Sequence, residues 1–196
     1  MDRFRSLYTV AKNNDRKIVI SLKTAYLLTK LVIDKRLDLP DPMKDESILV
    51  YYKRKKSGDY QEKDYYVWER PFIEKTVTYE GIHKNQSELV MDLNFYQFAE
   101  LIDIKPDADS HFIHSMSEPF SEEDLEDEVM HNWMNLFKMQ FHQLHASGHM
   151  NRQQLENLIK KVKPKRIFPI HSENPRLFKE LNNNVQIIKS GNKYNI

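Results

Sequence analysis

The sequence predicts an α/β fold built on a mainly parallel sheet. Helical and strand-like hydrophobic patterns alternate along almost the whole chain of 196 residues, which is the order that α/β proteins show. A strand, helix, strand pattern spans residues 141–170, and the crossover of such a unit places its two strands parallel. Two further short strands, at 185–188 and 194–196, are expected to close the chain.

The first half of the chain follows the same alternation. Apolar spacing predicts, in order, a helix at 2–12, a strand at 18–22, a helix at 24–34 and a strand at 47–52. A tyrosine-rich helical segment at 60–76 should be kinked or split by Pro71. Short strands are expected at 77–79 and 89–93, followed by a short helix at 95–101.

A strand at 111–114 and a longer helix come next. Ser121 and Asp124 have the spacing of a capping box, which predicts that the helix begins there and runs to about Met139. Its apolar stripe is expected to bury Leu125, Val129, Trp133 and Leu136.

Composition excludes several classes of protein. Thirty Lys and Arg against 29 Asp and Glu give a net charge of +1, so any contact with a nucleic acid must be local. The absence of cysteine excludes disulfides and thiolate chemistry and favours a cytoplasmic protein. No apolar stretch is long enough for a membrane span, and neither a GxGxxG nor a P-loop motif occurs. We therefore expect a soluble protein without a nucleotide cofactor.

Two histidines follow the strands of the 141–170 unit. His149 and His171 should emerge at one edge of the sheet, where open α/β sheets bind ligands. Ser147 and Gly148 permit a tight turn, and the N–H groups that open the next helix favour an anion. The pattern indicates a phosphate-binding loop beside a histidine, although each feature also has an ordinary structural explanation.

Three segments resemble a known family. They are HASGHM at 145–150, PKRIFPIHSE at 164–173 and SMSEPFSEE at 115–123. They resemble the β-CASP branch of the metallo-β-lactamase fold, the RNA-processing nucleases that include ribonuclease J. The resemblance implies that residues 1–105 form part of a β-CASP lobe, and that residues 106–196 form the carboxyl-terminal half of an αββα metallo-β-lactamase domain with its RNA-specificity motifs.

The resemblance also implies roles for individual residues. His149 matches the motif B histidine, which acts near the scissile phosphate, and His171 matches the motif C histidine, a zinc ligand. Glu173 is the candidate hydrogen-bond partner that orients His171. Contacts to RNA phosphates would come from four small residues: Ser147, Gly148, Ser115 and Ser117.

The family's zinc-binding motif HxHxDH is missing from this chain. The complete family enzyme holds two zinc ions, and a catalytic zinc needs about three protein ligands, whereas the resemblance assigns only His171 to that task. We expect the chain alone to hold no zinc and to lack nuclease activity. Its expected partners are RNA and an amino-terminal metallo-β-lactamase half, with homo-oligomers favoured by an uncovered sheet edge and no membrane partner.

Two functions from different classes remain open. The chain is either the carboxyl-terminal part of a zinc-dependent nuclease that hydrolyses RNA phosphodiesters, or a non-catalytic RNA-binding or partner-docking protein derived from that fold. Local features have two explanations as well. Ser115 and Ser117 suit helix capping as much as phosphate binding. The cations of 160–166 suit a solvated helix face or an RNA backbone, and the tyrosines at 51, 52, 60, 65 and 66 suit packing or base stacking.

Overall fold

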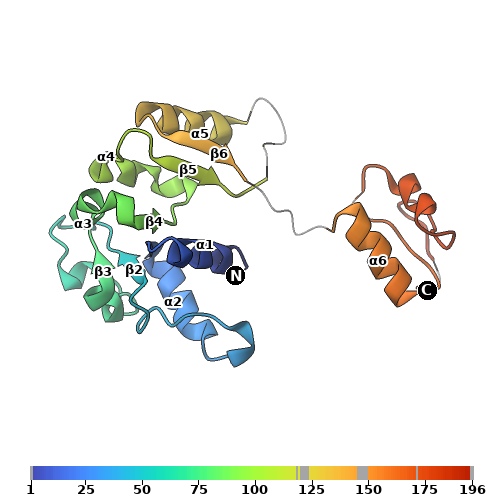
Figure 1. The fold of residues 1–196 in the computed structure, drawn as a ribbon, viewed down its shortest axis with the longest axis horizontal. Helices are drawn as coiled ribbons and strands as arrows, with labels where there is room; N and C mark the ends of the chain where they lie inside the picture. Colours follow the sequence, from blue (N-terminus) through green and yellow to red (C-terminus); the bar gives the residue numbers. More distant parts are fainter. Residues whose placement is uncertain (1, 118, 120–123, 145–149, 171, 195–196) are drawn as a thin grey trace. The chain divides into compact units, whose positions relative to one another are not determined.

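The computed structural model describes residues 2–117, 119, 124–144, 150–170 and 172–194. The chain divides into two units, residues 1–144 and 145–196, and each is described by itself (Figure 1). The helices of the first unit are α1 (Asp2–Asn13), α2 (Leu22–Leu31), η1 (Lys35–Leu37), η2 (Glu62–Asp64), η3 (Arg70–Lys75), α3 (Tyr79–Lys84), η4 (Gln86–Glu88), η5 (Phe95–Glu100), α4 (Leu101–Ile104) and α5 (Leu125–Leu136). Its strands are β1 (Lys17–Ser21), β2 (Ile48–Tyr51), β3 (Thr76–Val77), β4 (Leu89–Met91), β5 (His111–His114) and β6 (Gln140–Gln143).

Four of these strands form one sheet in the order β3-β2-β1-β4, and each neighbouring pair is parallel. The central strand β1 is buried on both faces, with Ile18, Val19 and Ile20 at most 1% exposed. Such a continuous apolar run is typical of a strand covered on both sides by helices. The predicted α/β fold with a mainly parallel sheet is therefore confirmed.

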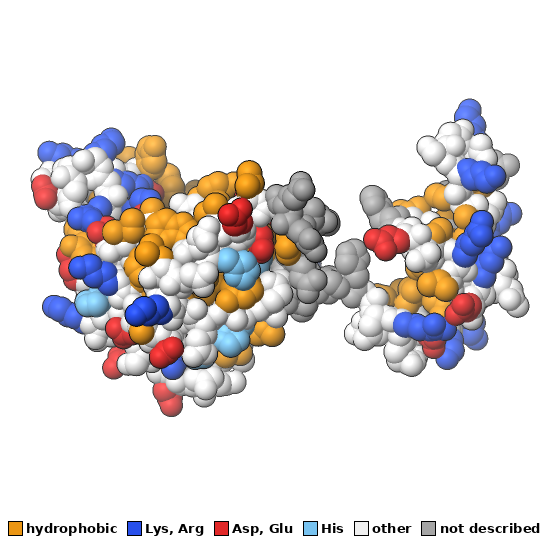
Figure 2. Space-filling view, turned by 90° about the horizontal axis from the view of Figure 1, so that it is seen from above, with side chains coloured by type: hydrophobic (Ala, Val, Ile, Leu, Met, Phe, Trp, Pro, Cys, Tyr) orange, Lys and Arg blue, Asp and Glu red, His pale blue; other side chains and the backbone are white. Residues whose placement is uncertain are grey.

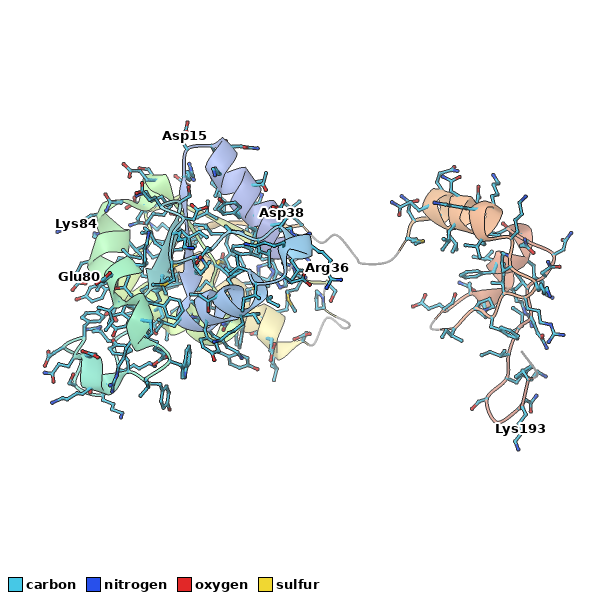
Figure 3. All side chains as sticks on the ribbon, turned by 90° about the horizontal axis from the view of Figure 1, so that it is seen from below. Asp15, Arg36, Asp38, Glu80, Lys84 and Lys193 are labelled. Carbon is cyan, nitrogen blue, oxygen red and sulfur yellow. The ribbon has the colours of Figure 1, made fainter. Side chains whose placement is uncertain are left out.

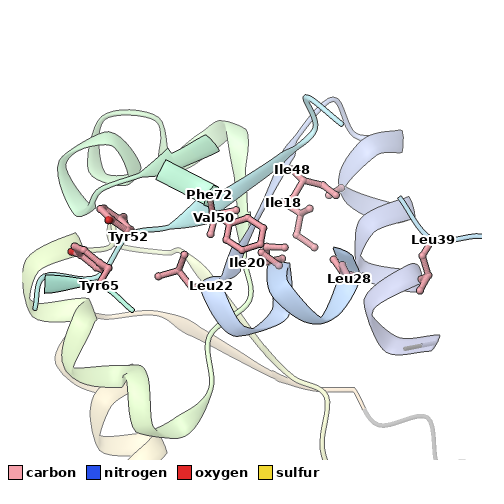
Figure 4. Packing of buried hydrophobic residues seen from close by; sticks show 12 residues of the cluster. Ile18, Ile20, Leu22, Leu28, Leu39, Ile48, Val50, Tyr52, Tyr65 and Phe72 are labelled. Atoms are coloured by element: carbon pink, nitrogen blue, oxygen red, sulfur yellow. The ribbon is translucent and has the colours of Figure 1, made fainter. Parts of the chain in front are cut away.

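The two faces of this sheet support separate core clusters. Ile18 and Ile20 of β1 project with Ile48 and Val50 of β2 toward Leu28 of α2 (Figure 4). On the opposite face, Val19 and Tyr51 pack with Ile82 and Ile104. Because side chains alternate along a strand, adjacent residues of β1 serve different clusters.

Strands β5 and β6 form a second, two-stranded parallel sheet, with His111 paired to Gln140 and His114 to Gln143. The connecting helix α5 begins at Leu125 with Asp124 as its N-cap, whose side chain accepts hydrogen bonds from two backbone N–H groups. The predicted capping box gave Asp124 the wrong role, because Asp124 is itself the N-cap of α5. Ser121, which was predicted to begin the helix, lies outside the described residues.

The buried side of α5 agrees with the prediction at Trp133, which is half-buried against the core, but differs at the other positions. Met130 and Met134 are 4% and 1% exposed, whereas Leu125 and Leu136 are 74% and 68% exposed. Met130 and Met134 pack with Phe98 and with aromatic residues of the small sheet. Because this side of α5 faces the core, Leu125 and Leu136 on another side face solvent. Sequence periodicity could not distinguish the two sides, because both are apolar.

The helical segment predicted at 60–76, to be kinked or split by Pro71, is split into two short 3₁₀ helices, η2 and η3. Pro71 lies in the first turn of η3, where the missing N–H costs no helical hydrogen bond. Helix α3 was not predicted, and the strand predicted at 77–79 ends at Val77.

The unit formed by residues 145–196 contains α6 (Arg152–Val162) and η6 (Pro175–Glu180). Asn151 caps α6 by accepting a hydrogen bond from the N–H of Gln154. Among the described residues, the strands predicted at 166–170 and 185–188 are reduced to one parallel bridge, Ile167 with Val185. Most of the strand predicted at 194–196 lies outside the described residues.

The predicted boundary between lobes near residue 106 stays a prediction. Phe98 and Phe112, which lie on either side of it, pack edge to face with centroids 5.6 Å apart, and both belong to the cluster around Met130 and Met134. No helix in the described part of the chain is long and apolar enough to cross a membrane.

Candidate RNA-binding site

The loop that carries Ser115 and Ser117 follows β5 directly and is held against the end of β6. The side-chain amide of Gln143 donates a 2.7 Å hydrogen bond to the carbonyl of Met116, and the N–H of Leu144 donates one of 3.0 Å to the carbonyl of His114. The structure thus brings the two predicted serines to the end of the strand after which the segment with Ser147, Gly148 and His149 begins. Those three residues, at 147–149, lie outside the described residues.

Both serines line a groove of about 900 Å³ in the first unit. One wall follows β4 and the residues after it, from Leu89 to Tyr96, and another follows β5 and its flanks, from Pro106 to Ser117. Among the strands of the described residues, each of these two has a partner on one side only, since β4 ends its sheet and β5 pairs with β6. The groove therefore lies along two open strand edges, which favour pairing with another strand.

The charges around this groove do not suit a polyanion. Its lining includes the cations Arg3 and Arg16, but also several acids: Asp92, Asp107, Asp109, Asp124, Glu126 and Asp127. Desolvation among these side chains raises the pKa of Asp92, although part of this residue reaches solvent and Arg3 opposes the shift. An apolar, acid-rimmed groove between strand edges fits a polypeptide better than RNA.

Two histidines of the small sheet, the exposed His111 and the half-buried His142, form a pair that the sequence did not single out. Nδ1 of His111 and Nε2 of His142 are 2.8 Å apart, and the rings stack with centroids 5.0 Å apart. A metal site would need further ligands. Among the described residues, no three His, Asp or Glu side chains lie close enough together to hold a metal ion, so these residues do not fit the zinc centre that the family resemblance implies.

The remaining predicted metal-site residues lie in the second unit. His171 falls outside the described residues, and Glu173 is exposed. Their roles as ligand and orienting partner stay predictions.

Positive charge is concentrated in the unit formed by residues 145–196. It contains ten Lys and Arg against three Asp and Glu, a net charge of +7, although the whole chain carries only +1. Lys160, Lys161, Lys163 and Lys165 are all exposed, and Figure 2 shows Lys and Arg side chains over much of the visible face of this unit. A local excess of this size attracts a nucleic-acid backbone. The chain-wide balance concealed it; counting charge segment by segment would have found it.

Residues 137–182 match the family model of the Zn-dependent metallo-hydrolase RNA specificity domain. This match supports a relationship of that segment to an RNA-specific family related to the metallo-β-lactamases. The matched range contains five of the seven predicted site residues, namely Ser147, Gly148, His149, His171 and Glu173. No curated protein matches the chain.

A solved structure shares the fold. The crystal structure of a protein of unknown function from Enterococcus faecalis V583 aligns with 89% of this chain at a TM-score of 0.57 and 20% sequence identity. The aligned part is 34% of that protein's chain, so this chain spans about a third of its length. At this identity the likeness shows the fold alone.

Proposed function

We propose that this chain is the carboxyl-terminal, RNA-binding part of a cytoplasmic, zinc-dependent β-CASP nuclease that hydrolyses RNA phosphodiesters. The observation that carries the proposal is the match to an RNA-specificity domain at 137–182, most of which falls in the unit with a net charge of +7. Cations there would hold phosphates, while Ser147 and Gly148 would add hydroxyl and backbone donors. Ser115 and Ser117 line the acid-rimmed groove and are assigned to the docking surface instead.

In this proposal the two motif histidines have different tasks. His149 lies beside the scissile phosphate, where an imidazole donates a proton to the leaving oxygen or stabilises its charge. His171 contributes one ligand to a zinc centre whose other ligands belong to an amino-terminal metallo-β-lactamase half, and Glu173 orients that ligand. The two zinc ions of such an enzyme would supply the activated water for hydrolysis.

The groove along β4 and β5 supports docking of that half. Outside the residues that line this groove, α5 has a further apolar surface, with Leu125, Val129 and Leu136 exposed by 74%, 40% and 68%. Uncovered apolar surface costs roughly 25 cal/mol per Å² in water. We therefore expect the isolated chain to self-associate and a metallo-β-lactamase half to suppress this. Light scattering over a concentration series, with and without that half, measures it; a monomer at all concentrations that is unchanged by the mixture would contradict the docking proposal.

RNA binding is tested by neutralising part of the basic unit. Lys160→Ala/Lys161→Ala should weaken binding of labelled single-stranded RNA and lower the slope of log affinity against log salt concentration by about one unit. The matched control is Lys35→Ala/Lys84→Ala, which removes two exposed lysines of the first unit; Lys84 points into solvent in Figure 3. Equal losses in the two double variants would mean that the basic unit is not the binding surface.

A non-catalytic function is the second candidate. It is favoured by the sequence, which has no HxHxDH motif and so leaves His171 as the one residue assigned to zinc. In either case the purified chain alone should hold no stoichiometric zinc and should not cleave 5′-labelled RNA. If the chain is part of a nuclease, it should bind zinc and cleave RNA once a half that carries HxHxDH is added. A non-catalytic protein should gain neither property. Zinc near one equivalent in the chain alone, lost in His171→Ala, would contradict the ligand count.

A further inference from the structure

Three exposed aromatic side chains lie in contact on the first unit, and we call them the aromatic platform: Tyr26, Tyr66 and Trp68. The rings of Tyr66 and Trp68 are nearly parallel, with centroids 6.4 Å and planes 9° apart. Tyr26 of α2 packs on Trp68 with centroids 5.1 Å apart. Their exposed fractions are 39%, 68% and 37%, respectively. Large rings are mostly buried in folded proteins, so an exposed group in mutual contact indicates a binding surface.

A buried carboxylate fixes the turn that presents two of these rings. Glu69 is 5% exposed and accepts hydrogen bonds of 2.7 and 2.6 Å from Nζ of Lys55, one at each oxygen. It also accepts a 2.9 Å hydrogen bond from the N–H of Tyr66, while its own N–H donates to the Tyr66 carbonyl at 2.8 Å. The turn is therefore ordered before a ligand arrives, which lowers the entropic cost of binding.

Cations accompany the rings, and the two acids close in sequence to Tyr66 are buried. Nζ of Lys30 lies 5.1 Å from the centroid of Tyr26, and Nζ of Lys55 lies 5.1 Å from that of Tyr66. Glu69 is satisfied within its turn, and Asp64, which is buried, accepts a hydrogen bond from the hydroxyl of Ser57. Flat apolar rings beside cations are the combination that binds single-stranded nucleic acids, because bases stack on the rings and phosphates approach the cations.

We propose that the aromatic platform is a base-stacking subsite for single-stranded RNA. This rests on the proposed function, since it assumes that the chain binds RNA. It adds to that function a contact with the bases on the first unit, besides the phosphate contacts of the basic unit. Because every base has a stacking face, the platform would hold RNA with little preference for sequence.

Tryptophan fluorescence observes the subsite directly. The chain has two tryptophans, and Trp133 packs beside the cluster of Phe98 and Met134. In a Trp133→Phe protein, Trp68 is the sole tryptophan. A 12-nucleotide oligouridine RNA should quench its emission as it binds, whereas an RNA duplex of equal length should bind without quenching, because its bases are already stacked on each other.

The RNA affinities of substituted proteins distinguish base stacking on the rings from a general preference for apolar side chains. Tyr66→Leu/Trp68→Leu keeps apolar side chains but removes both rings, and it should weaken oligouridine binding about tenfold or more in fluorescence anisotropy. Tyr66→Phe/Trp68→Phe keeps the rings and should bind within about threefold of the parent. Ile102→Ala is the control, because Ile102 is 57% exposed and lies outside both the platform and the groove. Circular dichroism confirms that each variant is folded.

The outcomes distinguish the platform from the proposed function. If anisotropy shows bound RNA while Trp68 is not quenched, or if the leucine pair binds as tightly as the parent, the platform is not a stacking subsite but RNA binding stands. If the leucine pair instead reduces self-association and leaves RNA affinity unchanged, the platform is a protein interface and the proposal is wrong. If the parent chain binds no RNA, the proposed function fails and the platform with it.

Discussion

The hydroxyl of Tyr51 donates a 2.7 Å hydrogen bond to Oε2 of Glu100, joining β2 of the large sheet to the end of η5. Glu100 is 7% exposed, and its other oxygen lies 2.5 Å from Nζ of Lys53. Burial, and then the hydrogen bond to Glu100, raises the pKa of Tyr51 far above its ordinary value. The phenol therefore stays protonated and remains a donor throughout the physiological pH range.

Tyr51→Phe should lower the free energy of unfolding by about 1–3 kcal/mol, because it leaves one oxygen of a buried carboxylate without its donor. Urea denaturation followed by tryptophan fluorescence measures this, since both tryptophans lie in the same unit as Tyr51. Tyr96→Phe, at an exposed position, should change stability by less than about 0.5 kcal/mol. Similar values for both variants would show that the Tyr51–Glu100 hydrogen bond contributes nothing.

Asp92 should make the first unit less stable as the pH rises. Desolvation raises its folded-state pKa above the ordinary value of 3.8, so the folded protein binds a proton more tightly than the unfolded chain does. The stability that protonation provides is present at low pH and is lost as pH rises from 3.8 through the raised pKa. Asp92→Asn should remove this decline, with a difference below about 1 kcal/mol because part of the side chain reaches water.

Asp45 provides a control of opposite sign for the same pH series. Burial alone would raise its pKa, but hydrogen bonds from Tyr8 and Ser47 lower it below 3.8. Its contribution to stability is therefore present above 3.8 and is lost as pH falls through the lowered value. Urea denaturation at a series of pH values measures both carboxylates. A parallel loss of stability in the two asparagine variants across the series would contradict both assignments.

In the complete nuclease, substitutions of His149 and His171 should have different effects on zinc content. His171→Ala is expected to lower zinc content and turnover together, because it removes a ligand. His149→Ala should reduce turnover, by a factor in the range of about 10² to 10⁴, and leave zinc content unchanged. Metal analysis of the two purified variants, beside their rates on 5′-labelled RNA, makes the comparison. Equal zinc losses would mean that the roles are misassigned.

The sequence predicted the fold well in segments whose apolar pattern is compatible with one type of structure only. The strand predicted at 18–22 is β1, Lys17–Ser21, and residues 111–114 form the predicted strand with the predicted bounds. The sequence predicted the position of helix α5 but not which side of it is buried, because Met130 and Leu125 are both acceptable in a core. Long-range packing decides between them.

Local sequence patterns predicted the residues of the candidate site. They could not predict how those residues come together in three dimensions. Ser115 and Ser117 lie where the strand pattern placed them, directly after β5. The buried and exposed tyrosines could not be distinguished in advance, because the helical segment predicted at 60–76 forms two separate short 3₁₀ helices. Tyr52 and Tyr65 are buried, and burial raises the pKa of each to about 12, whereas the adjacent Tyr66 is exposed beside Trp68.

The position of β1 has a consequence for the protein during its synthesis. This strand leaves the ribosome before its partners, yet it lies in the centre of the sheet and pairs with β2 and with β4, which ends at Met91. Its edge toward β4 stays unpaired until about seventy more residues have been added, which takes several seconds at about 5–20 residues per second. Throughout that time the nascent chain presents Ile18 and Ile20 in an incomplete sheet. This is the kind of segment that chaperones at the ribosomal exit bind.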